Sequence, residues 1–428
     1  MAKKKNQSKK LQSLSDLPDI LPDTNYSWDL ISRRMQNLAR SFGFLRVETP
    51  LLESANAYQV EPTPGVSATS SVQFQDMNEE SVALRSSMLP GVLRAYADQT
   101  WPEEHVLSKW HYSSPVITSD SIQKKYQVSW QYGFEVLGSF NSLIQAQLIT
   151  LAFKVFQSVG IANPLLEINT IGNAESRKDY EGVLRSFLKG RTYDLCDDCS
   201  DAIDADPMQV FRCAQESCKN IATEAPHIID YLHETNRKEL TDVLEGLDEI
   251  GLPYAMNPLF AGTPGSNGLV FRFSVLDEEK QQEHILGYGS GHTEVMENAT
   301  GKVTPSFGFQ GTLEQIRTAL QSMNMEIQHQ DVKSDVYLVP LGDRASKKAL
   351  RLFTELWDAD ITVHDHFGTL GVKNQLKAAE VAKARIALII GQKEAMDEMV
   401  ILRDVTSGMQ EVFQYERIID EVKKRLGK

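Results

Sequence analysis

The sequence predicts an α+β core that carries a helical insertion and is followed by a compact α/β domain. Two observations support this prediction. Residues 173–251 place apolar side chains at helical spacing, whereas residues 333–428 alternate short apolar strands with helical segments. With 428 residues, 41% of them hydrophobic and 24% charged, the chain is long enough for two or three packed domains. We therefore expect a core over residues 16–332 and an α/β domain over residues 333–428.

The first residues are too polar to join a core. Residues 1–15 are rich in lysine and contain no aromatic side chain, which predicts a flexible basic tail. Such a tail either keeps a protein soluble or contacts RNA phosphates. The start of the chain lacks the apolar stretch of a secretory signal, and no run approaches the roughly 18 apolar residues of a membrane helix. These features predict a cytoplasmic protein without a membrane partner.

The net charge of -14 is unevenly distributed along the chain. Residues 333–428 hold 16 basic and 15 acidic residues, a net charge of +1, which leaves -15 for the other residues. A polyanion such as RNA would therefore be repelled least by the C-terminal segment.

Three segments of the expected core resemble the signature motifs of one enzyme family. Residues 41–53 (SFGFLRVETPLLE) read as a helix end, a glycine break and a strand that runs into proline. Residues 131–138 (QYGFEVLG) and 304–309 (TPSFGF) read as strands, the second leading into Leu313 and Glu314. These segments resemble motifs 1, 2 and 3 of histidyl-tRNA synthetases. The resemblance implies the antiparallel sheet core of class II aminoacyl-tRNA synthetases, with the helical insertion between motifs 2 and 3.

Motif 1 forms the two-fold interface in the resembled family, so the resemblance also implies a homodimer. The segment is apolar enough to need a partner surface or a core. The side chains concerned are Phe42, Phe44, Val47, Leu51 and Leu52.

The C-terminal segment has its own order of elements. In order and spacing it resembles the anticodon-binding domain of histidyl-tRNA synthetases, which implies tRNA as a partner. Lys373 and Lys377 are RNA-binding candidates, because residues four apart share a helix face. A generic α/β module used for dimer contacts or for a protein partner is the alternative. The expected strands are residues 336–341, 360–363, 387–391, 399–403 and 411–415, and the expected helices are residues 345–357, 372–384 and a final one from residue 416.

All four cysteines fall in one window of the helical insertion, as the pairs Cys196/Cys199 and Cys213/Cys218. Two close pairs of thiolates can bind Zn²⁺ tetrahedrally, and four sulfurs leave no open position, so the metal would be structural. In a reducing cytosol this is favoured over a disulfide pair, and four free buried cysteines are the other alternative.

The positions where the family holds its nucleotide-binding arginines carry other residues. Activation of an amino acid places its carboxylate against the α-phosphate of ATP, so the site must neutralise two anions with arginines and Mg²⁺. Residues 112–121, which match the motif 2 loop, contain no arginine, and Gln315 stands where motif 3 of the family has one. By the resemblance, Lys125 and Glu314 are the residues of an ATP site that remain in this chain.

The histidine pocket of the family is altered in the same way. Ser87 and Leu89 replace the glutamate and threonine that hold the amino group of the substrate in the family. Residues 260–266 and 289–293 match its histidine-specific segments without their arginine or tyrosines. Gln131 and Glu135 match the remaining pocket residues, and either could instead be a satisfied polar residue of a central strand.

These substitutions predict a catalytically impaired or inactive paralogue with a tRNA-binding or regulatory role. Two alternatives stay open. The first is an active histidine-tRNA ligase that uses ATP and Mg²⁺, which would need replacement cations. The second is a regulatory subunit resembling that of ATP phosphoribosyltransferase, although that family generally lacks a C-terminal domain of this kind.

Overall fold

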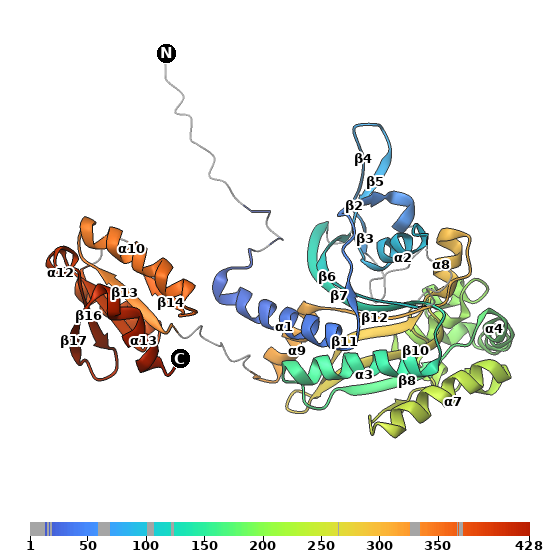
Figure 1. The fold of residues 1–428 in the computed structure, drawn as a ribbon. Helices are drawn as coiled ribbons and strands as arrows, with labels where there is room; N and C mark the ends of the chain where they lie inside the picture. The colour runs from blue at the N-terminus through green and yellow to red at the C-terminus, as the bar shows by residue number, and fades with distance from the viewer. Residues whose placement is uncertain are drawn as a thin grey trace, which may run out of the picture. The chain divides into compact units, whose positions relative to one another are not determined.

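The chain forms two compact units, Met1–Ile327 and Gln328–Lys428 (Figure 1). Apart from residues 13 and 14, the expected basic tail lies outside the described residues. No helix in the described ranges is long and apolar enough to cross a membrane. The computed structural model describes residues 13–14, 17, 19–58, 69–100, 107–120, 124–263, 265–325, 334–365, 367 and 371–428.

The first unit is built on a nine-stranded, mostly antiparallel sheet. Its order is β1-β6-β7-β12-β11-β10-β8-β9, with β3 paired to β6. Only the short edge strands β1 and β9 pair in parallel among its described strands. The strands are β1 (Leu45–Arg46), β3 (Thr69–Ser71), β6 (Leu107–Asp120), β7 (Lys125–Gly138), β8 (Leu165–Thr170), β9 (Ala255–Met256), β10 (Asn267–Asp277), β11 (Gln282–Gly291) and β12 (Ser306–Thr312).

One face of this sheet is covered by the helices α1, α3, α7 and α9, whose apolar residues share one hydrophobic core with the sheet. The helix α2 packs with α8 on the other face, beside a small sheet of order β2-β5-β4 (Figure 1). The helices of the unit are α1 (Pro22–Ser41), α2 (Leu89–Ala97), α3 (Ser142–Val159), α4 (Ala174–Lys189), α5 (Asp197–Ala202), α6 (Glu216–Thr223), α7 (Glu234–Glu249), α8 (Thr293–Thr300) and α9 (Leu313–Ser322). The small strands are β2 (Leu52–Ser54), β4 (Gln73–Gln75) and β5 (Ser81–Leu84), and the 3-10 turns are η1 (Ala55–Tyr58), η2 (Thr192–Asp194), η3 (Pro207–Arg212) and η4 (Ile228–Tyr231).

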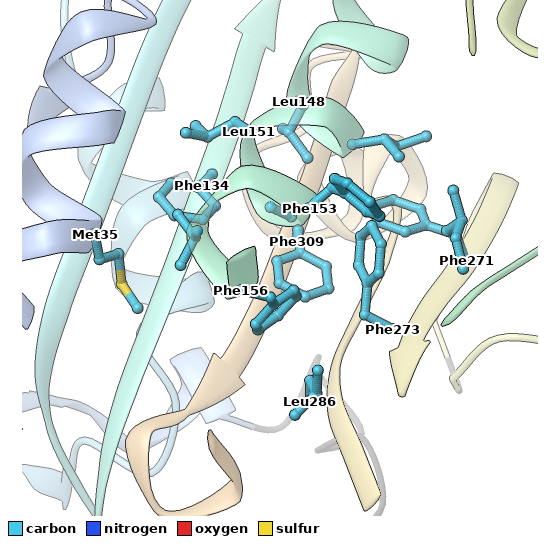
Figure 2. Close-up of a cluster of buried hydrophobic side chains, with 14 of the residues drawn as sticks. Met35, Phe134, Leu148, Leu151, Phe153, Phe156, Phe271, Phe273, Leu286 and Phe309 are labelled. Atoms are coloured by element: carbon cyan, nitrogen blue, oxygen red, sulfur yellow. The ribbon is translucent and has the colours of Figure 1, made fainter. Parts of the chain in front are cut away.

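Aromatic rings fill the layer between the large sheet and α3 (Figure 2). Phe156 on α3 lies edge-on to Phe309 of β12 at a centroid distance of 6.0 Å and is tilted against Phe273 of β10 at 5.4 Å. Phe271 stacks on Phe309 at 5.5 Å. Edge-to-face and offset contacts of this kind stabilise a core beyond the area that the rings bury.

The alternation along β7 assigns its side chains to the two faces of the sheet. Tyr132, Phe134 and Val136 are fully buried in the aromatic core. Since successive side chains of a strand point to opposite faces, Gln131 and Glu135 face away from that core.

The helical segment expected at residues 173–251 divides between two cores. Its first part, through η4, forms a separate hydrophobic cluster that includes Tyr180, Leu184 and the buried Cys199 and Cys218. The last helix, α7, instead packs its apolar side against α3 in the main core. The residues that it contributes are Leu240, Val243 and Leu247.

The second unit has a five-stranded sheet of order β14-β13-β15-β16-β17. Its first three strands are parallel, and β16 and β17 form an antiparallel hairpin. The helices α10 and α13 pack on one face, whereas α11 packs on the other. The elements are β13 (Val336–Pro340), α10 (Asp343–Asp358), β14 (Val363–Asp365), α11 (Val372–Val381), β15 (Ile386–Ile390), α12 (Gln392–Met396), β16 (Met399–Asp404), β17 (Gln410–Gln414), η5 (Tyr415–Arg417) and α13 (Ile418–Leu426).

Two element bounds in this unit differ from the sequence-based expectation, and backbone geometry explains both. Asp360 has a φ of 57°, so the chain turns there and the strand expected from residue 360 begins at Val363. Lys383 has a φ of 51°, and α11 ends at Val381 rather than near residue 384. A left-handed residue is a common end of a helix.

Candidate functional site

A cavity of about 560 Å³ lies beside Gln131 and Gln310 and reaches the start of α9. Its volume is within the range of small-molecule sites. Strands β6, β7, β11 and β12 and the first turns of α9 form its walls. The lining residues are Ser86, Val116, Thr118, Gln127, Ser129, Gln131, Glu283, His284, Ile285, Tyr288, Gln310, Gly311, Thr312, Glu314, Gln315 and Thr318.

Gln131 lines this cavity, but protein groups already occupy both ends of its amide. Its Oε1 accepts a hydrogen bond from the backbone N–H of Met88 at 2.6 Å. Its Nε2 donates to Oε1 of Gln310 at 2.9 Å. Both glutamines are about nine-tenths buried, so these bonds satisfy polar groups that water reaches poorly. Gln131 therefore behaves as a satisfied polar residue of the sheet.

Glu135 lies deeper on the same face and is fully buried. The hydroxyl of Tyr112 is 3.4 Å from Glu135 Oε1 and 3.4 Å from Gln310 Oε1. The Glu135 carboxylate lies over Gly308, where an added Cβ would come within 1.8 Å of Oε2. Likewise, a Cβ on Gly133 would lie 2.3 Å from the Tyr112 ring. Glycine at these two positions leaves room for the Glu135 carboxylate and the Tyr112 ring.

Glu314 lies in the first turn of α9, and both of its carboxylate oxygens face the backbone N–H of Trp130, at 3.0 and 3.1 Å. Burial raises the pKa of this carboxyl, because the charged form loses water. The neighbouring Gln315 completes a capping box with Thr312, whose backbone N–H donates to Gln315 Oε1 at 2.7 Å. Gln315 thus stabilises the start of α9 in addition to lining the cavity.

Lys125 lies apart from the cavity. It is exposed at the beginning of β7, opposite Asp120, and is not among the lining residues. By strand alternation it is on the same face as Gln127, Ser129 and Gln131, but it lies at the first position of the strand. The structure therefore brings Gln131 and Glu314 together in one cavity, and Lys125 is not among its lining residues.

Arg85 is buried beside the site, but its hydrogen bonds hold the protein together. Its side chain is 1% exposed and donates to the backbone oxygens of Thr49, at 2.6 Å, and Pro115, at 2.9 Å. It also forms an ion pair with Glu48 at 3.1 Å. The guanidinium joins the motif 1 segment to β6, because each of its partners belongs to one of these two segments.

The segment predicted to match the family's amino-group site is buried. Leu89 is 1% exposed and packs in the hydrophobic cluster of α2 and α8, together with Met88 and Tyr112. Ser87 is 2% exposed. These positions offer no carboxylate to a substrate ammonium group.

The two segments predicted to match the histidine-specific segments of the family make local contacts. In the first, Phe260 stacks on Tyr288, and the Thr263 hydroxyl lies 2.9 Å from that of Ser266; Pro264 lies outside the described residues. In the second, the buried His292 lies 3.4 Å from Ser290, and burial lowers the pKa of its imidazole to about 4.

The four cysteines converge, as the spacing predicts. Their Sγ atoms all lie within 4.8 Å of one another, between α5, η3 and α6. Cys196 and Cys213 are 3.7 Å apart, which is close to the about 3.8 Å edge of a tetrahedron with Zn–S bonds of about 2.3 Å. Backbone N–H groups donate to Sγ of Cys218 at 3.3 Å and of Cys213 at 3.4 Å. The cluster could hold a metal ion.

Lys373 and Lys377 lie one turn apart on α11 of the second unit, and both are exposed. The buried side of that helix carries Gln375 and Ala379, and Gln375 Nε2 donates to the backbone oxygen of Pro340 at 3.0 Å. The two lysines therefore extend from a helix that is fixed to the sheet.

The sequence analysis did not predict that Gln310 bonds to Gln131, nor that Glu283 and His284 line the cavity. Gln310 could have been found, because it follows Phe309 in the motif 3 strand and alternation directs it to the face of Gln131. His284 gave no signal, because β11 has a register irregularity near it that alternation does not predict.

An antiparallel sheet with one face closed by helices, motif strands at its centre and a separate α/β unit defines a class II aminoacyl-tRNA synthetase fold. The model of the histidyl-tRNA synthetase family matches residues 16–253, and that of the anticodon binding domain matches residues 335–425. The chain belongs to the histidyl-tRNA synthetase family.

Individual relatives agree with this assignment. The histidine–tRNA ligase of Clostridium botulinum (strain Loch Maree / Type A3) is 27% identical over 405 residues, which cover 94% of this chain and 96% of the relative. The apo structure of Staphylococcus aureus histidyl-tRNA synthetase has a TM-score of 0.79 at 22% identity and covers 96% of this chain and 100% of its own. An ATP phosphoribosyltransferase regulatory subunit/histidyl-tRNA synthetase from Bacillus halodurans C has a TM-score of 0.60 at 15% identity, covering 90% and 99%.

Proposed function

We propose that this chain is a non-catalytic member of its family, a pseudoenzyme that binds tRNA or regulates a partner and does not form histidyl-adenylate. The main observation behind this proposal is that the cavity has no basic side chain among its described lining residues. None of the described residues that line it is a lysine or an arginine, and Glu283 and Glu314 are acidic. ATP carries a triphosphate, and charge builds on its phosphoryl oxygens during adenylation, so such a wall repels both substrate and transition state.

The undescribed internal stretches of the first unit, residues 59–68, 101–106, 121–123 and 264, contain no lysine or arginine in the sequence. The undescribed residues 1–12 contain five lysines. The nearest candidate by sequence, Lys125, lies outside the lining, and Arg85 is already paired with Glu48 and two backbone oxygens. An active histidine-tRNA ligase using ATP and Mg²⁺ is therefore the less supported function.

Histidine-dependent exchange of pyrophosphate into ATP tests this proposal. We expect a rate about 10³-fold or more below that of an active relative, because loss of one preorganised donor costs about 10²- to 10³-fold and at least two are missing. The Staphylococcus aureus enzyme, assayed in parallel, is the control. Exchange near the typical enzyme rate of about 10 per second would refute the proposal and restore the ligase.

The proposed tRNA contact lies on α11. The unit that matches the anticodon binding domain has a net charge of +1 over residues 333–428, so it repels RNA less than the rest of the chain does. Lys373 and Lys377 extend from α11 and form no ion pair with an acidic side chain among the described residues. We expect Lys373→Ala plus Lys377→Ala to weaken tRNA binding and to reduce the slope of affinity against salt by about one to two, since each phosphate contact releases a counterion.

Lys347→Ala is the matched control for this experiment, because Lys347 is exposed on α10, on the opposite face of the same sheet. Unchanged tRNA affinity and salt dependence in the double variant would exclude the α11 contact. A protein partner would then be favoured, including the regulatory-subunit alternative suggested by the structure from Bacillus halodurans C.

We also propose that Cys196, Cys199, Cys213 and Cys218 bind one structural Zn²⁺. The proximity of the four sulfurs and the N–H groups directed at two of them support tetrathiolate binding. We expect metal analysis to find about one zinc per chain, lost in Cys196→Ser plus Cys199→Ser together with a lower melting temperature. Protein purified without chelator that holds no zinc, or a double variant that retains it, would disprove the site.

A homodimer is proposed through the motif 1 segment. Leu45, Leu51 and Leu52 are 70%, 50% and 51% exposed there in the single chain, which favours a covering surface. Sedimentation should give a dimer at micromolar concentration, and Leu51→Glu plus Leu52→Glu should give a monomer. Leu276→Glu, at a position 41% exposed on β10, should leave the dimer intact. A monomeric wild type would contradict this proposal.

A further inference from the structure

The four cysteines of the insertion divide into an inner and an outer pair. Cys199 and Cys218 are 3% and 0% exposed and belong to the hydrophobic cluster of the insertion. Cys196 and Cys213 are half-buried and pack against that cluster from outside. This outer pair takes one cysteine from each of the two sequence pairs. An oxidant in solvent would therefore reach these two sulfurs before the inner ones.

The outer pair is also placed where its sulfurs can approach each other. The two Sγ atoms are 3.7 Å apart, and a disulfide bond of about 2.0 Å would need them to move closer by about 1.7 Å. Cys196 lies on the connection between η2 and α5, and Cys213 lies on that between η3 and α6. The inner cysteines lie within α5 and α6. A small shift of the outer pair therefore leaves both helices intact.

Zinc binding would keep these sulfurs reactive toward an oxidant. The thiolate is the nucleophilic form of cysteine, and a thiol that coordinates a metal is held as the thiolate. A structural zinc site uses four protein ligands. Removal of the outer pair would leave two sulfurs, which are too few to retain the metal in a closed site.

We propose that the outer pair is a redox switch, in which a hydroperoxide oxidises Cys196 and Cys213 to a disulfide and Zn²⁺ is released. The inference rests on the proposed zinc site. One outer thiolate attacks a peroxide oxygen, so an S–O bond forms, the O–O bond breaks and hydroxide leaves. The other thiolate attacks that sulfur, forms the S–S bond and displaces a second hydroxide. The sulfurs lose two electrons to the peroxide, and two solvent protons convert the hydroxides to water.

The effect of the switch is confined to the insertion. The cluster that contains Cys199 and Cys218 is separate from the aromatic core of the large sheet. The new bridge would join residues 17 positions apart, so it would still tie the α5 region to the α6 region. Oxidation therefore loosens the insertion without unfolding the sheet, and a dithiol can reverse it by thiol–disulfide exchange.

Treatment of the full chain with hydrogen peroxide tests the proposal. We expect about one Zn²⁺ released per disulfide formed, and a lower melting temperature. Peptide mapping by mass spectrometry should find Cys196 joined to Cys213, with Cys199 and Cys218 still open to alkylation after denaturation. Dithiothreitol with added Zn²⁺ should restore the original melting temperature. Protein oxidised in guanidinium is the control, because an unfolded chain closes the short loops 196–199 and 213–218 more easily.

The variant Cys213→His separates the switch from the metal site. Three sulfurs and one imidazole also bind structural Zn²⁺, but the outer pair can no longer form a disulfide. We expect this variant to hold zinc and to release it several-fold more slowly under peroxide. Cys199→His is the matched control, with the same ligand set and both outer cysteines, and should remain as sensitive as the wild type. Metal analysis shows which variants hold zinc, and mapping of the wild type decides if neither does.

Three outcomes would overturn the switch and leave the zinc site in place. They are a dominant bridge within either sequence pair of the folded protein, zinc release by peroxide without a disulfide, and equal rates of release from the wild type and zinc-loaded Cys213→His. Wild-type protein purified without chelator that holds no zinc would instead refute the zinc site, and the switch with it.

Discussion

The aromatic layer between the large sheet and α3 is the constraint on which the rest of the first unit depends. Phe156, Phe273 and Phe309 interlock there, and rings of this size cannot be moved to solvent without a large loss of stability. Because side chains alternate along a strand, the residues between those that enter the core must face the opposite side of the sheet. Gln131, Glu135 and Gln310 share the face opposite the aromatic core for that reason, and the register of β7 with β12 places them close together. A slip of one residue would turn these two amides and the carboxylate toward the apolar helices and turn the rings away from them.

The fold could be predicted further than the site, because the two depend on different kinds of information. Glycine breaks, apolar runs and helical spacing are local, and they indicated the motif strands, the helical segment and the α/β unit. The convergence of four cysteines also followed from spacing. The hydrogen bond between Gln131 and Gln310 joins residues 179 positions apart, and no local sequence pattern predicts it. Arg85 illustrates the same limit, since its use as a link between the motif 1 segment and β6 depends on where two backbone oxygens lie.

The polar groups of the site are largely satisfied by one another. Gln131 bonds to Met88 and Gln310, Tyr112 approaches both Gln310 and Glu135, and Gln315 closes the capping box of α9. These bonds fix the two glutamines and satisfy polar groups that are about nine-tenths buried. The Nε2 atom of His284 is a buried nitrogen of this region without a hydrogen-bond partner among the described residues.

The capping box at Gln315 makes one side chain serve two purposes. An arginine at this position would add a positive charge to the cavity wall, yet it would remove the amide oxygen that accepts from the N–H of Thr312. The Thr312 hydroxyl would still accept from the backbone N–H of residue 315, so only the reciprocal half of the box would be lost. The charge of the cavity wall and the order of the first turn of α9 therefore cannot be changed independently at this position, where ligand preference and helix stability trade against each other.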